Sequence, residues 1–318
     1  MRYALQVQYI GKNYAGSQIQ FENGKEIETP TIQGELEKAI CKLIKCGSRC
    51  EAGDGLRKRN EQSKTLQNRR YDRNNSIGNE AICRLQAEGA RRQPYLFNVS
   101  NQDCTGEKGN TQNINRHFKT VFSGRTDRGV NALGQVVHFD TDKCIVASKF
   151  VYQMNEILPK DISVSDLKLV DKNFHAQKSA KRRHYRYVFV NRKYKNAFDG
   201  DLMRVKFDIN VDRINKALSY LLGEHDFSSF KNSRTLNPSK ICFIEKAVAM
   251  RDGDKIIINI VGNRFLYNMV RIIVGTLLEI EGHNRSAEHM EQVLKACDRR
   301  KAGQTVSPYG LTLVEVTY

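Results

Sequence analysis

The sequence SGRTDRGVNALGQVVHF spans residues 123–139 and carries the pattern from which the fold and chemistry of the chain are inferred. It follows a short apolar pair typical of a strand end, and it finishes in the alternating apolar residues of another strand. If the segment between them is extended, Arg125 and Asp127 point to the same side, so we expect the carboxylate beside the guanidinium. A charged cluster between strands commonly presents chemistry, although a polar turn with a surface ion pair has the same pattern.

The composition favours a polyanionic partner. The 318 residues include 52 Lys or Arg and 35 Asp or Glu, giving a net charge of +17. Nucleic acid is the first candidate and an anionic membrane surface the second, while the excess could also serve solubility alone. A hydrophobic fraction of 40% at this length permits one large domain or two of ordinary size.

Cysteine usage and hydropathy indicate a cytoplasmic protein. The eight cysteines are spread thinly along the chain, unlike the disulfide framework of a short secreted protein, so we expect reduced thiols. A strand-like segment begins at residue 2, so we expect no signal or transit peptide. No apolar run approaches membrane-spanning length, and we expect no membrane partner.

Hydrophobic periodicity predicts an α+β fold built from two related units. In the first unit, strands are expected at 2–9, 118–126, 136–139 and 162–170, and helices at 31–45 and 148–158. In the second unit, strands are expected at 185–190, 241–250, 255–261 and 311–318, and helices after an Asp212 cap and at 265–280 and 286–297, with a polar loop over 224–230. The predicted domains are residues 1–46 plus 116–170 and residues 171–318, with a cleft between them.

Residues 47–115 interrupt the first unit. Only 18 of these 69 residues are apolar, and neither a helical stripe nor a strand alternation persists. Loops of this length are uncommon inside a compact domain, so we expect a mostly disordered insertion that leaves the domain intact. The insertion could strengthen RNA binding through electrostatic attraction, or it could be passive. We favour the passive interpretation.

Elimination leaves a carboxylate as the leading reactive group. The sequence lacks a dinucleotide-binding glycine motif, a P-loop, an HExxH motif and a CxxC pair. None of His138, His175 and His184 has a Ser or Cys partner that would make a nucleophilic dyad. Carboxylates do act as covalent nucleophiles, and an adjacent arginine keeps Asp127 ionised. We therefore expect neither a metal nor a cofactor.

These residues also carry a family resemblance. The motif GRTD at 124–127, with GV at 129–130 and GQVVHF at 134–139, closely resembles the catalytic motif of the TruA-type tRNA pseudouridine synthases. Further segments match the family in order and cover nearly everything outside the insertion: YIGKNYAG at 9–16, TIQGELEKA at 31–39, FHA at 174–176 with YRY at 185–187, DFSSF at 226–230, MVR at 269–271 with VG at 274–275, and GL at 310–311 with LV at 313–314.

The resemblance implies an enzyme that isomerises uridine to pseudouridine in the anticodon stem-loop of tRNA, at tRNA positions 38 to 40, without cofactor or metal. It implies the pseudouridine synthase fold, in which two related α/β units join their mixed sheets around a basic cleft, and a homodimer. Asp127 would be the nucleophile, attacking either the sugar C1′ or the ring C6. Arg125 would pair with it and help to hold the flipped nucleotide, and Tyr185 would pack on the uracil ring.

Further positions are candidate contacts. The resemblance adds Thr126, Leu311 and Arg271 as substrate-binding residues, and Arg271 is expected to be either a buried partner for a carboxylate or a residue of the RNA cleft. The basic run supplies four candidate RNA contacts: Lys178, Lys181, Arg182 and Arg183.

The chain departs from the family pattern at two positions, where Asn131 replaces the usual His and Gln177 the usual Arg. Two alternatives stay open at this point: an RNA-binding protein of this fold without turnover, and a pseudouridine synthase for another RNA.

Overall fold

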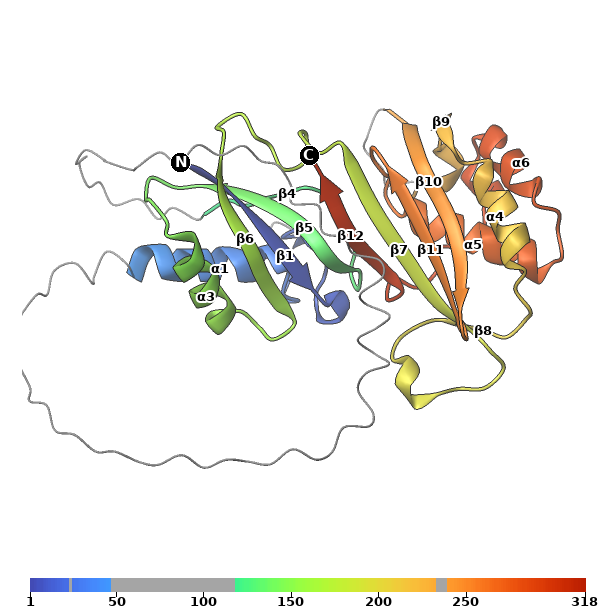
Figure 1. Ribbon diagram of the computed structural model, residues 1–318, viewed down its shortest axis with the longest axis horizontal. Coiled ribbons are helices and arrows are strands. Elements are labelled where there is room, and N and C mark those ends of the chain that lie inside the picture. The colour runs from blue at the N-terminus through green and yellow to red at the C-terminus, as the bar shows by residue number, and fades with distance from the viewer. Residues whose placement is uncertain (23–24, 47–117, 233–238) are drawn as a thin grey trace, which may run out of the picture. The chain divides into compact units, whose positions relative to one another are not determined.

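A single mixed β-sheet organises the part of the chain that the computed structural model describes, residues 1–22, 25–46, 118–232 and 239–318 (Figure 1). The insertion predicted at 47–115 lies outside the described residues. The strand order is β6-β1-β5-β12-β7-β11-β10-β9. These strands are β1 (Arg2–Tyr9), β5 (Asn131–Asp140), β6 (Ile162–Val170), β7 (Arg182–Asn191), β9 (Gly223–Asp226), β10 (Ile241–Asp252), β11 (Lys255–Gly262) and β12 (Leu311–Thr317).

Short elements complete the sheet and its connections. Strand β4 (Val121–Phe122) pairs with β5, and β8 (Arg204–Val205) pairs with β7. A separate hairpin joins β2 (Phe21–Glu22) to β3 (Lys25–Glu26). The 3-10 helices are η1 (Gly11–Asn13), η2 (Ala197–Asp199), η3 (Ser228–Phe230) and η4 (Arg299–Lys301).

The last strand of the chain lies in the middle of the sheet. Strand β12 runs parallel to β5 on one side and antiparallel to β7 on the other. The other strand pairs along the main sheet order are antiparallel. The C-terminal strand therefore joins the sheet built by β6, β1 and β5 to the sheet built by β7, β11, β10 and β9.

Strand periodicity explains this assembly. Tyr3, Leu5, Val7 and Tyr9 of β1 are all buried, as the predicted alternation requires. Strand β1 is hydrogen-bonded to β5 and β6 at both edges, so its position is fixed from two sides. The predictions of a first strand at 2–9 and of a hairpin around Asp252 and Gly253 are confirmed.

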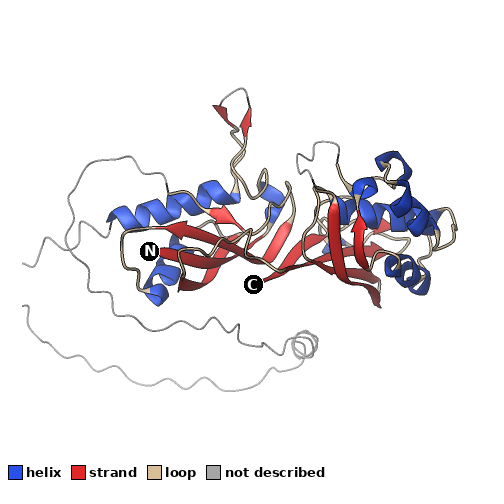
Figure 2. Ribbon diagram, turned by 90° about the horizontal axis from the view of Figure 1, so that it is seen from above, coloured by secondary structure: helices blue, strands red, loops and turns tan. Residues whose placement is uncertain are grey.

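In the described residues, five α-helices pack beside the sheet (Figure 2). They are α1 (Ile32–Cys46), α3 (Ala147–Ile157), α4 (Val211–Ser219), α5 (Met269–Gly282) and α6 (His289–Ala296). Helices α4 to α6 gather near β9, β10 and β11, and α1 runs beside β1 and β5 (Figure 1). The apolar stripe of α1 explains its place, because Ile32, Leu36 and Ile40 are fully buried. In the described part of the chain, no helix is long and apolar enough to cross a membrane.

Several predicted elements need correction. The strand expected at 118–126 is paired only at Val121–Phe122, because the following residues turn to carry Asp127. The predicted polar loop at 224–230 forms β9 and η3, and the side chains of Phe227 and Phe230 are fully buried in the core. Helix α4 is capped by the side chain of Asn210, which accepts a hydrogen bond from the Arg213 N–H, whereas Asp212 lies in the first turn.

Helix α5 begins four residues later than its apolar pattern predicted. Asn268 has a φ of 63°, a left-handed conformation that ends the preceding turn and sets Met269 as the first helical residue. The helix is buried nearly all round, as expected from its composition. Its backbone approaches the segment before β12 so closely that a Cβ on Gly275 would lie 1.7 Å from the Gln304 carbonyl oxygen.

Replacing Gly275 should therefore separate α5 from residues 303–306. We expect Gly275→Ala to lower the free energy of unfolding by about 1–3 kcal/mol or more, because an added methyl group in a packed contact forces the backbone to shift. Urea denaturation followed by circular dichroism measures the change. Gly124→Ala is the matched control, since its Cβ would meet only the Tyr185 hydroxyl, at 3.9 Å. Equal midpoints for the two variants would contradict this close contact.

Candidate active site

Asp127 lies in a tight turn between β4 and β5. Its backbone forms an isolated antiparallel bridge with Gly16, and its carbonyl accepts a hydrogen bond from the Val130 N–H at 3.1 Å. Gly129 closes the turn with a φ of 82°, a conformation that favours glycine. A Cβ at this position would also lie 2.9 Å from Pro308 and Tyr309. The turn is therefore fixed both by its own backbone and by the segment that enters β12.

Thr126 anchors the turn to the first strand and its loop. The Thr126 and Tyr9 hydroxyls share a buried hydrogen bond of 2.7 Å. The Thr126 N–H donates to the Ser17 hydroxyl at 2.8 Å, and the Ser17 N–H donates to the Thr126 carbonyl at 3.1 Å. Thr126, predicted to bind substrate, is buried and uses its polar groups inside the protein.

Gln135 on β5 supports the same turn through hydrogen bonds of its side chain. Its amide donates to the Gly124 carbonyl at 2.9 Å, and its side-chain oxygen accepts from the buried Ser123 hydroxyl at 2.5 Å. Sequence analysis assigned no role to Gln135 or Ser17. Gln135 belongs to the quoted segment 123–139 and Ser17 directly follows the quoted segment 9–16, but only their burial and partners show that they hold the turn.

The ion-pair partner of Asp127 is Arg271 of α5. Nη1 of Arg271 lies 3.3 Å from Oδ2 of Asp127, and the two side chains are 15% and 18% exposed. Arg271 is itself held in place, because it donates to the Val306 carbonyl at 2.8 Å and to the Asn268 side chain at 3.1 Å. Arg271 therefore partners a largely buried carboxylate, which is one of the two roles expected for it.

The ion pair predicted between Arg125 and Asp127 is wrong. The residues leave the strand after Phe122, so the rule that residues two apart share a side does not apply here. Arg125 is exposed, and the carboxylate takes Arg271 instead.

Burial dominates the electrostatics of Asp127. It raises the pKa of the carboxyl above its ordinary value, while the charge of Arg271 and its hydrogen bond oppose the rise. Without Arg271, the same burial would favour the protonated form more strongly. Arg271 therefore favours the charged form of the Asp127 carboxylate against the effect of burial.

Tyr185 of β7 lies close to this turn. Its side chain is buried, and its ring packs edge-to-face on Phe265 with the ring centroids 5.0 Å apart. Burial raises the pKa of the Tyr185 hydroxyl, and negative charge on Asp127 contributes to the rise, so the phenol is neutral. Leu311, the first residue of β12, is buried opposite Tyr187 of β7. Asp127, Arg271 and Tyr185 thus come from three different elements to one place.

The four basic candidates divide into two kinds. Arg183 donates to four backbone carbonyls, those of Ser123, Gln177, Ala180 and Asn263, and burial lowers its pKa. Arg182 pairs with Glu245 at 2.5 Å. Lys178 and Lys181 are exposed. Arg183 thus links the segment before β7 to the active-site turn by hydrogen bonds, and Lys178, Lys181 and the paired Arg182 are the exposed cations among the four.

The two positions that depart from the family pattern have defined surroundings. The Asn131 side chain accepts from the Gly11 N–H at 2.9 Å and donates to the Tyr309 carbonyl at 3.3 Å. It therefore ties the loop after β1 to the loop before β12, on either side of Asp127. Gln177 is exposed, and its backbone carbonyl accepts from Arg183.

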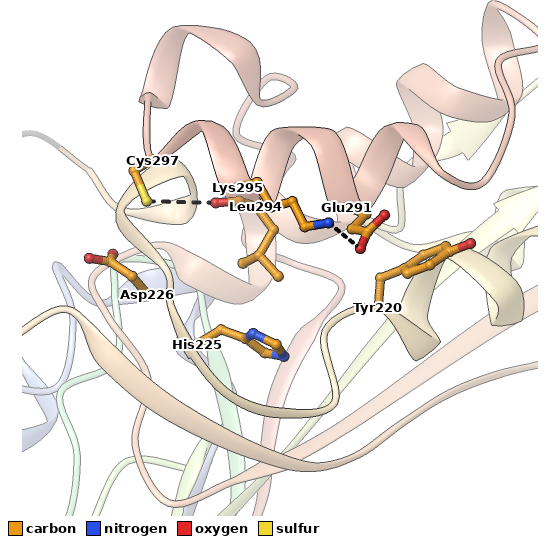
Figure 3. Close-up of a pocket in the computed structure, with 7 residues that line it drawn as sticks. All are labelled: Tyr220, His225, Asp226, Glu291, Leu294, Lys295 and Cys297. Carbon is orange, nitrogen blue, oxygen red and sulfur yellow. Dashed lines mark hydrogen bonds and ion pairs between the residues drawn. The ribbon is translucent and has the colours of Figure 1, made fainter.

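A small hollow lies elsewhere, between β9 and α6 (Figure 3). Its lining residues are Tyr220, His225, Asp226, Glu291, Leu294, Lys295 and Cys297. None of them is a predicted site residue. Among the described residues, no group of three or more His, Cys, Asp or Glu side chains could hold a metal ion.

The electrostatic role of Arg271 gives a direct prediction. Arg271→Gln removes the charge and the hydrogen bond that lower the pKa of Asp127, so we expect that pKa to rise further above its ordinary value. Carboxyl-carbon NMR titration measures it. Arg285→Gln is the control, because it breaks a surface pair with Glu279 at 3.0 Å and should leave Asp127 unchanged. An unchanged or lower Asp127 pKa in Arg271→Gln would contradict the assignment.

Comparisons with known proteins identify the family. Residues 217–318 match a family model described as tRNA pseudouridine synthase. The tRNA pseudouridine synthase A of Brevibacillus brevis is 41% identical over 197 residues, which cover 62% of this chain and 81% of that protein. The enzyme of the same name from Anoxybacillus flavithermus is 36% identical over 241 residues, covering 74% of this chain and 97% of that protein.

A solved Cbf5-Nop10-Gar1 complex contains a chain that aligns with 62% of this chain and 40% of its own length, at 11% identity and a TM-score of 0.29. This structural similarity is too weak to support a family assignment, so the assignment depends on the sequence relatives. Their similarity extends over most of their length. The chain belongs to the tRNA pseudouridine synthase A family, isomerases that convert uridine in tRNA to pseudouridine.

Proposed function

We propose that Asp127 is the nucleophile of a reaction at uridines in the anticodon stem-loop of tRNA. The observation that supports this role is the pair of Asp127 with Arg271, 3.3 Å apart and largely buried. A carboxylate held charged in a partly desolvated site is a reactive group. The anticodon stem-loop as target comes from the family resemblance.

The reaction exchanges one bond to the sugar for another. The bond between C1′ and N1 of the uracil breaks, a bond between C1′ and C5 forms, the proton on C5 is released and N1 takes up a proton. Any bond that Asp127 forms to the substrate breaks again before the product leaves. Asp127 could begin this exchange by attacking C1′ or C6, and both routes fit a single carboxylate. In either route Arg271 would favour the ionised form of the carboxylate, which its charge and its hydrogen bond to Asp127 support.

Neighbouring residues supply binding in this proposal. Tyr185 would present its ring to the uracil after the nucleotide leaves the stack. Arg125, which is exposed and close in sequence to the nucleophile, would contact RNA rather than hold Asp127. Lys178 and Lys181 would contact phosphates. The basic cleft, Thr126 and Leu311 as substrate contacts, the homodimer and the cytoplasmic location remain predictions.

Tritium release from tRNA that carries 5-tritiated uridine tests the nucleophile. We expect Asp127→Ala and Asp127→Asn to lower the rate by at least about a thousandfold, the order of loss when a covalent nucleophile is removed. Asp142→Asn, an exposed carboxylate change, is the control and should release tritium at the wild-type rate. Release by Asp127→Ala at the wild-type rate would exclude Asp127.

Mapping the modified nucleotide in the same product tests the target. Pseudouridine within the anticodon stem-loop supports the proposal. Pseudouridine confined to another region of the tRNA would overturn it and leave the role of Asp127 intact.

A further inference from the structure

The loop between β7 and β8 displays two aromatic side chains to solvent. Tyr194 is 81% exposed and Phe198 is 97% exposed. Lys193 and Lys195 flank Tyr194 and are also exposed. We call residues 192–201 the aromatic loop. Single exposed apolar residues are ordinary on protein surfaces, but here two large rings and two lysines lie within six residues.

The aromatic loop is folded, although its two rings are exposed. Arg192 forms ion pairs with both Asp199 and Asp254. The Asn196 side chain accepts from the Phe198 N–H at 3.0 Å and caps η2. The rings are therefore held outward on a framework of charged and capping contacts.

The charge of the loop is positive where it faces solvent. Asp199 is neutralised by Arg192, and Asp201 by Lys12 at 2.7 Å. Neither Lys193 nor Lys195 forms an ion pair with any residue of the described ranges. Two free ammonium groups beside two free rings complement a polyanion that offers unstacked bases.

The loop is tied to the active-site turn. Lys12, which pairs with Asp201, belongs to η1, and the Gly11 N–H in the same turn donates to the Asn131 side chain. A Cβ on Gly11 would lie 2.1 Å from the Val130 carbonyl oxygen, so this turn rests directly on the residues after Asp127. Figure 1 shows the aromatic loop, with its short helix, below β8.

We propose that the aromatic loop binds unpaired bases of the tRNA substrate. Tyr194 and Phe198 stack on the bases, and Lys193 and Lys195 contact the adjoining phosphates. The inference deepens the RNA binding in the proposed function and rests on tRNA as substrate, but it does not depend on Asp127 being the nucleophile. Stacking on aromatic side chains tolerates any base sequence, because every base has a π-face.

Equilibrium binding of two RNAs tests the proposal. One is the tRNA, and the other is a blunt RNA duplex of the same length without unpaired bases. We compare Tyr194→Ala/Phe198→Ala and Lys193→Gln/Lys195→Gln with the wild type. Tyr152→Ala, which removes a 67% exposed ring from α3, is the matched control.

The aromatic variant should bind tRNA about fivefold or more weakly and the duplex as well as wild type does. The lysine variant should bind both RNAs more weakly, with a shallower dependence of log Kd on log salt concentration. Tyr152→Ala should match the wild type throughout. Because binding is measured without turnover, these results are independent of the tritium-release experiment.

Unchanged tRNA affinity in the aromatic variant would overturn the proposal. So would an equal loss of affinity for tRNA and duplex, because the rings would then not act on unpaired bases. Sedimentation velocity of the same proteins without RNA tests whether the rings instead contact a second copy of the chain. If the aromatic variant converts a wild-type dimer to a monomer, the rings contact a second copy of the chain and the proposal fails.

Discussion

The ion pair between Asp127 and Arg271 is the interaction on which the arrangement of this protein depends. It joins residues 144 positions apart in the chain. A buried carboxylate is unfavourable in water-poor surroundings unless a partner compensates its charge, and burial does raise the pKa of Asp127. The structure meets this requirement with a guanidinium that also donates from Nε to the Val306 carbonyl and from Nη1 to the Asn268 side chain.

The rest of the sheet brings these two groups together. Strand β12 inserts between β5 and β7 and so connects the turn that carries Asp127 with the strand that carries Tyr185. The segment entering β12 supplies the Val306 carbonyl to Arg271 and packs against Gly275 of α5. Asn131 links the same segment to the loop after β1. Moving α5, β12 or the first loop would therefore displace the carboxylate or its partner.

Local patterns were enough to predict most elements and the position of Asp127 in a turn between two strands. Strict alternation over 2–9 and the hairpin at Asp252–Gly253 are local signals, and the structure matches them. The partner of Asp127 was predicted wrongly because Arg125 is two residues away, and sequence spacing carries no information on a contact across 144 residues. The predicted polar loop at 224–230 shows the same limit, since only packing against α5, α6 and η4 explains why Phe227 and Phe230 are buried.

The central claim is that Arg271, and not Arg125, sets the ionisation of Asp127. The direct measurement is the pH dependence of single-turnover pseudouridine formation in wild type, Arg271→Gln and Arg125→Gln. Loss of rate at low pH reports protonation of the essential carboxylate. The account predicts that Arg271→Gln moves this loss to higher pH, while Arg125→Gln lowers tRNA affinity and leaves the loss at the wild-type pH. A shift in Arg125→Gln with none in Arg271→Gln would contradict it.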